Sequence, residues 1–368
     1  MDKALLGQRV AQAREDAGLT QVDLGRAVEL DRSAISRLEL GERKLNVPEL
    51  VQIAEALGRP LSFFVADPVP AVVSRRTDAA PTHETTQRLD VELEQFASDI
   101  QGLLRRGFLP VRERVDYRTP RNHTEAEHTA TAVRAQIALE SGPIEDLGQV
   151  CEELGMYTFS AHLGAQGADG GCVEVETETR TAGAVVLDGD IAPGRRRMTL
   201  AHELGHWIFG DAYDSEATND AESMVSSFAI HFLAPRAGVS KVWNEYRTWK
   251  PRDRALAVAA IFRLSWSAAI NQLRNLELVN PSQHRSFREH EPNSGDYLRL
   301  KLNWREECAA PYLSPSLTAA ILNAYVDGQL TTARSLELLR GTLPVSELPT
   351  RAEDSIEDLR RSFAGHDG

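Results

Sequence analysis

The sequence predicts a mostly α-helical chain with one small β-sheet, in which an all-α N-terminal domain precedes an α+β domain. Apolar residues recur at helical spacing through most of the 368 residues, whereas only the runs CVEVETE and AGAVVLD look like strands. The chain is also too long for one ordinary domain. We expect four parts, namely an N-terminal domain, a linker with a connecting helix, an α+β domain and a C-terminal helical extension with a charged tail (1–66, 67–123, 124–280 and 281–368).

Short helices separated by turn signals are predicted for the N-terminal domain. The first has apolar side chains at helical spacing and ends at a glycine (Leu6, Val10, Ala13 and Gly18). Thr20, with Asp23 three residues later, is a good N-cap for a second helix, and Asp31 has the same role for a third. Gly41 ends the third helix, and Pro48 suits the first turn of a fourth, where its missing N–H is harmless.

Residues 66–86 are rich in Pro, Ala, Thr and Asp and show little periodicity, which is typical of a linker. An amphipathic helix is predicted directly after it, over residues 87–107. Its apolar stripe consists of six side chains (Leu89, Leu93, Phe96, Ile100, Leu103 and Leu104). Residues 110–123 are polar and carry no clear pattern.

The two strands of the α+β domain are predicted to follow two helices and to precede two more. These helices span residues 125–141, 143–154, 197–209 and 219–233, and residues 251–278 are again predicted to be helical. Pro235 ends the fourth of them. Residues 281–296 are predicted to be a polar loop, and two further helices are expected near 314–326 and 331–340.

Composition and charge argue against several classes of protein. A net charge of −13 does not suit a protein that coats nucleic acid, so any DNA contact has to be local. The chain has no apolar run of about eighteen residues, as a membrane span requires, and its start, MDKALLGQRV, lacks a signal-peptide pattern. Cys151, Cys172 and Cys308 are too scattered for a disulfide framework or a cysteine zinc site. We therefore expect a cytoplasmic protein.

The segment RRRMTLAHELGHWIFGD carries the strongest chemical signal in the chain. His202 and His206 are four residues apart, so on a helix their imidazoles project from one face and can converge on one ion. Glu203 lies near the same face, close enough to act on a water at the metal. The helix is supported by apolar residues within and around the motif (Met198, Leu200, Ala201, Leu204, Trp207 and Ile208). This pattern is typical of a zinc site.

A catalytic zinc ion commonly has three protein ligands and one open position. The candidates for the third ligand are the downstream acids Asp211, Asp214, Glu216, Asp220 and Glu222. Glu222 is favoured because it shares a predicted helix face with apolar residues, where an unpaired charge would be costly. The alternative is a half-exposed glutamate that is favoured only by the helix dipole. His231, nine residues further on, should face away from Glu222 and is not assigned to the site.

The HELGH motif, followed by an E-x-x-x-[N/S]-x-F-A helix that ends in Leu-x-Pro, resembles the ImmA/IrrE-type metallopeptidase family over roughly residues 124–280. The resemblance implies a zincin-like fold, in which Glu203 is the general base and the zinc ligands are His202, His206 and Glu222. Val225 and Ser226 stand where the family commonly has Ala-Asn. They would be neighbours of the site and not ligands. Residues 264–280 also resemble the small helical segment that this family carries after its catalytic helices.

The N-terminal motif GLTQVDLGRAVELDRSAISRLELGERKLNVPELVQIAEAL places polar side chains on the outer face of the helix at 31–40. These side chains are Arg32, Ser33, Ser36 and Arg37, of which arginine can read guanine edges and serine can form short hydrogen bonds. Gln21, at a helix start, could hold a phosphate or an adjacent recognition residue. Arg43 and Lys44 suit phosphate contacts. Residues 5–65 thus resemble the Cro/repressor-type (XRE) helix-turn-helix.

The sequence therefore predicts a transcriptional regulator that binds a double-stranded DNA operator, as a homodimer, and carries a Zn²⁺-dependent metallopeptidase-like domain that cleaves a protein partner or another repressor. Residues 1–66 contain nine Lys/Arg and ten Asp/Glu, a net charge of −1, so a helix-turn-helix used only for protein contacts stays open. Two further alternatives remain. One is a non-catalytic regulator with a structural or sensory zinc site. The other is an antitoxin in which residues 300–345 neutralise a partner.

Overall fold

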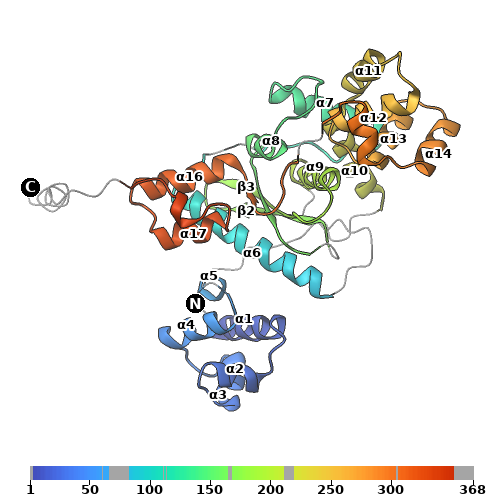
Figure 1. Cartoon of the computed structure of the whole chain (residues 1–368). Coiled ribbons are helices and arrows are strands. Elements are labelled where there is room, and N and C mark those ends of the chain that lie inside the picture. Colours follow the sequence, from blue (N-terminus) through green and yellow to red (C-terminus); the bar gives the residue numbers. More distant parts are fainter. Residues whose placement is uncertain are drawn as a thin grey trace, which may run out of the picture.

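The computed structural model describes residues 3–59, 61–65, 83–110, 112, 114–164, 168–210, 219–303 and 306–351. This part of the chain contains seventeen α-helices, one 3-10 helix and one four-stranded sheet (Figure 1). The predicted fold class, mostly α with a small sheet, is confirmed. Most of the predicted linker and the charged tail lie outside the described residues. The four predicted domain ranges stay a prediction.

The N-terminal bundle comprises α1 (Lys3–Asp16), α2 (Gln21–Ala27), α3 (Arg32–Glu39), α4 (Val47–Ala56) and α5 (Leu61–Val65). The predicted caps are present: Thr20 and Asp23 form a capping box on α2, and the Asp31 side chain accepts the Ala34 N–H of α3. A small core of its own holds the bundle together, including Leu24, Ile35, Leu38, Ile53 and Phe64. Figure 1 shows the bundle as a separate body, with α5 nearest to α6 (His83–Arg105).

The sheet has the strand order β2-β3-β1-β4, formed by β1 (Met156–Ala161), β2 (Gly170–Glu176), β3 (Thr181–Asp188) and β4 (Tyr312–Leu313). β1 and β3 are parallel, and the two outer pairs are antiparallel. Each face of the sheet is covered. One face packs on α9 and its neighbouring helices, whereas the other packs on α6, α16 and α17 (Figure 1). Because β1 is buried on both faces, its sequence MYTFSA does not alternate, and the sequence analysis assigns no strand there.

Nine helices contribute to, or pack against, the core on the first face of the sheet. They are α7 (His123–Gln136), α8 (Leu147–Glu153), α9 (Pro193–Phe209), α10 (Asn219–Leu233), α11 (Arg236–Glu245), α12 (Pro251–Ile261), α13 (Trp266–Asn275), α14 (Pro281–Glu289) and α15 (Ser294–Arg299). α10 has the predicted bounds. α9 begins four residues before the predicted start, because Pro193 suits a first helical turn. α11 was not predicted.

Residues 251–278 are helical, as predicted, and they form two helices, because Arg263 has a positive φ of 54° and Ser265 caps a new helix, so α12 and α13 bend by 112°. One predicted element is wrong. Residues 281–296 are not a loop, because capping boxes at Asn280 and Asn293 start α14 and α15. In the described residues no single helix is long and apolar enough to cross a membrane, and α12 and α13 pass that test only as a bent pair.

The C-terminal helices are joined to the sheet by specific contacts. α16 (Pro315–Val326) and α17 (Thr332–Leu339) match the two predicted helices, and a 3-10 turn follows (Val345–Glu347). Glu152 on α8 accepts the N–H groups of Ser316 and Leu317, so a buried carboxylate caps α16. Burial raises the pKa of Glu152. β4 adds this segment to the edge of β1, which ties residues 312–339 to the same core as the sheet.

Candidate metal centre and DNA-reading helix

Helix α9 carries both histidines of the HELGH motif and is buried along most of its length. Pro193 occupies its first turn, and Gly210 ends it in the left-handed conformation, with φ 65°. His202, Glu203 and His206 are only 2%, 0% and 3% exposed. The side chains that the sequence marks for chemistry therefore face the interior, where a buried polar group needs a partner.

The glycine of the motif sets how closely α10 approaches α9. A Cβ at Gly205 would lie 2.9 Å from Val225 Cγ1 and 3.1 Å from Phe228 Cδ1, closer than the packing allows. The two helices can therefore pack with their side chains interlocked at this point. The close approach brings the first turns of α10 over the histidines.

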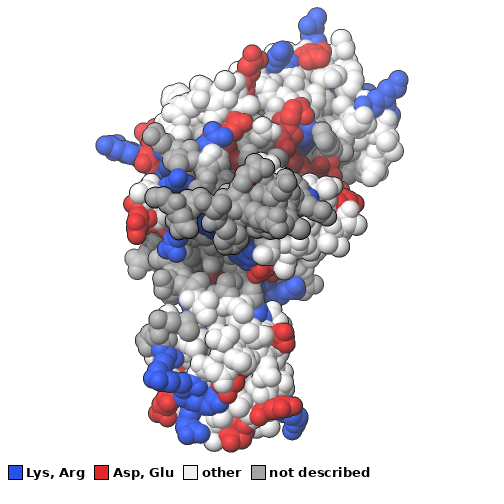
Figure 2. Space-filling model, turned by 90° about the vertical axis from the view of Figure 1, so that its left-hand side faces the viewer, with Lys and Arg blue, Asp and Glu red and all other residues white. Residues whose placement is uncertain are grey.

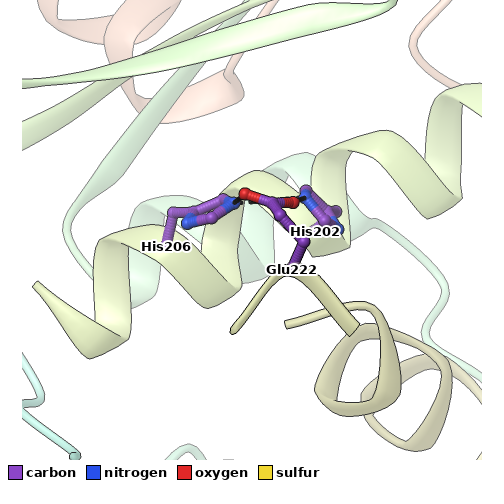
Figure 3. Close-up of side chains that lie close together, drawn as sticks. All are labelled: His202, His206 and Glu222. Atoms are coloured by element: carbon purple, nitrogen blue, oxygen red, sulfur yellow. Dashed lines mark hydrogen bonds and ion pairs between the residues drawn. The ribbon is translucent and has the colours of Figure 1, made fainter. Parts of the chain in front are cut away.

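The structure brings His202, His206 and Glu222 together (Figure 3). The two Nε2 atoms are 3.1 Å apart, and the Glu222 oxygens lie 3.1 Å from His202 Nε2 and 3.5 Å from His206 Nε2. Zinc bonds of about 2.0–2.1 Å in a tetrahedral site put ligand atoms about 3.3 Å apart. Among the described residues, this is the one group of three or more His, Cys, Asp or Glu side chains that could hold a metal ion. The donor set and its spacing fit zinc.

Glu222 enters the cluster from the first turn of α10 and keeps contact with solvent. Its side chain is 43% exposed. Hydrogen bonds from His202, and then from His206, hold the pKa of the Glu222 carboxyl well below its ordinary value, although partial burial opposes them. The carboxylate is therefore ionised and aimed at both imidazoles, as a metal ligand must be.

Glu203 sits beside the cluster inside the protein. Burial and the nearby Glu203 charge both raise the pKa of Cys172, which lies on the strand β2. Glu203 is thus buried next to His202 in the chain and close enough to β2 for its charge to act on Cys172. This placement suits a group that exchanges protons with a substrate held at the metal.

The other candidates for the third ligand do not reach the cluster or lie outside the described residues. Asp220 is exposed on the first turn of α10. Asp211, Asp214 and Glu216 lie outside the described residues. His231 is buried near the far end of α10, where its Nδ1 is 3.3 Å from Gln272 Nε2.

The sequence placed Ser226 beside the site and not among the ligands, and in the structure its hydroxyl contacts a ligand. Ser226 Oγ lies 3.3 Å from His202 Nδ1, on the side of the ring opposite Glu222. The spacing of four residues from Glu222 to Ser226 was available in the sequence and would have indicated a shared helix face. Which ring nitrogen it addresses could only be read from the packing of α9 on α10.

The recognition helix predicted in the N-terminal domain is α3. Ala34, Ile35 and Leu38 are buried, and the opposite side of the helix carries the predicted DNA contacts. Arg32, Ser33 and Arg37 are exposed, and Ser36 is half-buried. Figure 2 shows Lys and Arg side chains gathered at one end of the N-terminal bundle.

Four of the predicted contact residues, including Arg43, have hydrogen-bond partners within the protein. Arg37 Nε donates to the Ser33 carbonyl at 3.4 Å. Ser33 Oγ donates to the cap residue Asp31, at 2.7 Å. Gln21 Nε2 donates to Glu39 at 2.8 Å, and Glu39 also pairs with Arg14 on α1, at 2.6 Å.

Arg43 donates two hydrogen bonds to Glu49, at 2.5 and 3.2 Å, whereas its neighbour Lys44 is exposed. The guanidinium of Arg43 is thus held on the start of α4. Of the two basic residues after α3, Arg43 is engaged by Glu49 and Lys44 is exposed to solvent.

Comparison with known proteins supports the same two domains. Residues 10–64 match the family model described as helix-turn-helix, and residues 151–274 match that of the IrrE N-terminal-like domain. The chain therefore combines an XRE-type helix-turn-helix with an IrrE N-terminal-like domain, and the resemblance found in the sequence is confirmed.

Curated relatives share part of the chain. HTH-type transcriptional regulator RamB of Mycobacterium tuberculosis, in two strains, is 25% identical over 326 residues, covering 75% of this chain. The chain spans 66% of the length of RamB. HTH-type transcriptional regulator PrpR of the same species is 32% identical over 72 residues, or 20% of this chain and 15% of PrpR. ComR from Streptococcus suis, a solved structure, is 12% identical, with 92% and 94% of the two chains covered, at a TM-score of 0.17.

Proposed function

We propose that this chain is a DNA-binding transcriptional regulator whose second domain is a zinc-dependent peptidase acting on a protein. The observation that carries the proposal is the convergence of His202, His206 and Glu222 beside the buried Glu203. Matches to a helix-turn-helix model and to regulators by name support the DNA-binding half.

Within the second domain, His202, His206 and Glu222 would hold the ion. When bound, zinc would acidify a water molecule and polarise a peptide carbonyl. Glu203 would accept a proton from the attacking water and pass it to the leaving amine. Its burial keeps bulk water from competing for that proton, and the partly exposed Glu222 leaves the cluster open to solvent on one side.

In the N-terminal domain, α3 would enter the major groove and Arg37 would contact base edges. Its neighbours on the exposed face, Arg32 and Ser33, would add contacts. Lys44 would bind the phosphate backbone. The near-neutral charge of residues 1–66 implies that operator affinity depends on these few contacts and on pairing of two copies on two half-sites.

Metal content tests the zinc half of the proposal. Wild-type protein purified without chelator should hold about one zinc per chain, because three protein ligands form a catalytic zinc site. The double variant His202→Ala/His206→Ala should hold none, whereas Asp220→Ala, on the first turn of α10, should keep the full content. Equal zinc in wild type and in the double variant would overturn the assignment.

Substrate trapping tests the catalytic step. Glu203→Gln keeps the size and position of the side chain but cannot accept a proton, so it should bind zinc and retain an uncleaved protein partner in a pull-down. Wild-type protein should release that partner as fragments. A partner that is retained intact and equally by both proteins would argue for binding without cleavage.

A structural or sensory zinc site is the second candidate, and the low exposure of His202, Glu203 and His206 favours it. In this alternative, zinc supports the packing of α10 on α9 and no peptide is cut. Zinc removal would then lower the melting temperature and operator affinity together, in wild type and Glu203→Gln alike. A peptidase predicts in addition a cleavage that only the wild type performs.

A further inference from the structure

We propose that Ser226 is a positioning residue for His202, which fixes the imidazole in the tautomer and orientation that bind the metal. This inference rests on the proposed zinc site. Its basis is the contact between Ser226 Oγ and His202 Nδ1, at 3.3 Å, on the same helix that supplies Glu222. One face of α10 would thus provide the ligand Glu222 and, through Ser226, a hydrogen bond that orients the ligand His202.

The two nitrogens of His202 have different neighbours. Nε2 faces the cluster, with Glu222 Oε2 and His206 Nε2 each 3.1 Å away. Nδ1 faces Ser226, one helical turn beyond Glu222. Since residues four apart on a helix lie on one face, Glu222 and Ser226 contact the two ring nitrogens of His202 from the same side of α10.

This arrangement favours metal binding because it fixes which nitrogen of His202 carries the proton. A neutral imidazole carries its proton on one nitrogen and a lone pair on the other. For Nε2 to offer its lone pair to zinc, Nδ1 must carry the proton and donate it. Ser226 Oγ is an acceptor within reach of Nδ1, and His202 is only 2% exposed, so bulk water is a poor substitute. Partners of this kind, which hold the outer nitrogen, raise metal affinity by about 10–100-fold.

The close packing of α9 on α10 makes the contact possible. Gly205 lies in contact distance of Val225, the residue directly before Ser226. A larger residue at position 205 would push α10 away from α9 and lengthen the distance from Ser226 to His202. Gly205 therefore helps to set the distance between Ser226 and His202.

A matched pair of variants separates the hydrogen bond from the space that the side chain fills. Ser226→Thr keeps the hydroxyl, and Ser226→Val introduces a side chain of nearly the same shape as threonine but without the hydroxyl. Zinc affinity, measured by competition with a chromogenic chelator, should fall about 10–100-fold for Val and Ala at this position and stay near the wild-type value for Thr. Ser223→Ala, an exposed serine of the same helix, is the control and should not change it.

The visible spectrum of the cobalt(II)-substituted protein gives a second measurement that does not depend on catalysis. The spectrum should shift in Ser226→Val and not in Ser226→Thr, because the orientation of His202 changes the geometry around the ion.

Equal zinc affinity in Ser226→Val and wild type would overturn this inference and leave the zinc site intact. An equal loss in the Thr and Val variants would also overturn it, because it would show that shape alone matters. A wild-type chain that binds no zinc would overturn the proposed site together with the role of Ser226.

Discussion

In the N-terminal domain the side chains predicted to touch a ligand come mainly from one short helix and its loop, whereas in the second domain they come from two helices and lie mostly inside the protein. Arg32 and Arg37 stand on the surface of α3. His202 and His206 are buried, and Glu222 reaches them from α10. The first site needs only a folded helix, but the second needs the correct packing of one helix on another.

This difference decides what a substitution does. At an exposed contact of α3, the change should act on DNA affinity and leave stability alone, because surface substitutions seldom change stability. At the buried centre, the same change should act on metal binding and on the fold together, because a buried group that loses its partner is costly. Variants at the two sites can break or sharpen this contrast.

Glu222→Ala should have the largest effect. Removing one of three ligands should weaken zinc binding by far more than the roughly 10–100-fold loss expected for an outer partner such as Ser226. Asp220→Ala removes a carboxylate from the same helical turn and should leave zinc affinity unchanged. Chelator competition measures both variants, and similar losses in the two would mean that general negative charge, and not ligation, attracts the ion.

Glu307→Ala should unfold the second domain more readily. The Glu307 side chain is 9% exposed, and it accepts hydrogen bonds from Arg197, Arg263 and the Leu147 N–H. Leaving Arg197 buried without its partner should lower the free energy of unfolding by about 3–5 kcal/mol. This variant should also lose zinc at a lower denaturant concentration, because Arg197 lies on α9.

The neighbouring Glu306→Ala is the matched control for that measurement. Glu306 pairs with the buried Arg196 at 2.7 Å, but its own side chain is 63% exposed. Its loss should lower the free energy of unfolding by about 0–1 kcal/mol, because Arg196 keeps hydrogen bonds to the carbonyls of Gly189, Ile191 and Glu307. Urea denaturation followed by tryptophan fluorescence compares the two variants, and equal losses would contradict the expected difference between a buried and an exposed carboxylate.

Arg37→Ala should weaken operator binding without changing stability. If Arg37 contacts a guanine edge, its loss should cost about 1–3 kcal/mol of binding free energy and relax preference at one base pair. Binding to a selected operator and to a scrambled duplex, at several salt concentrations, measures both effects. Unchanged operator binding would favour the alternative in which the N-terminal domain contacts protein.

Lys44→Ala should have a smaller and less specific effect than Arg37→Ala. Lys44 follows the helix stop at Gly41 and can reach phosphate, so its loss should weaken binding to all sequences alike and lower the salt slope by about one unit. Arg43→Ala should weaken binding less, because Arg43 is already paired with Glu49. A larger effect for Arg43 would show that this pair opens on DNA.

The sequence alone determined the features that depend on local pattern. The caps at Thr20 and Asp31, the buried side of α3, the bounds of α10 and the i, i+4 histidines all follow from helical periodicity and from residues close in the chain. The choice of Glu222 among the downstream acids also came from a helix-face argument, and its carboxylate lies in the cluster.

Only the tertiary structure decided the features that join distant segments. It paired β4 with β1, packed α16 and α17 on the sheet, and put Glu307 against Arg197 more than a hundred residues away. It also formed the hydrogen bond from Gln21 to Glu39 and placed Ser226 beside His202. The physical reason is that periodicity records which side of an element is buried, whereas the identity of the partner depends on how separate elements pack in three dimensions.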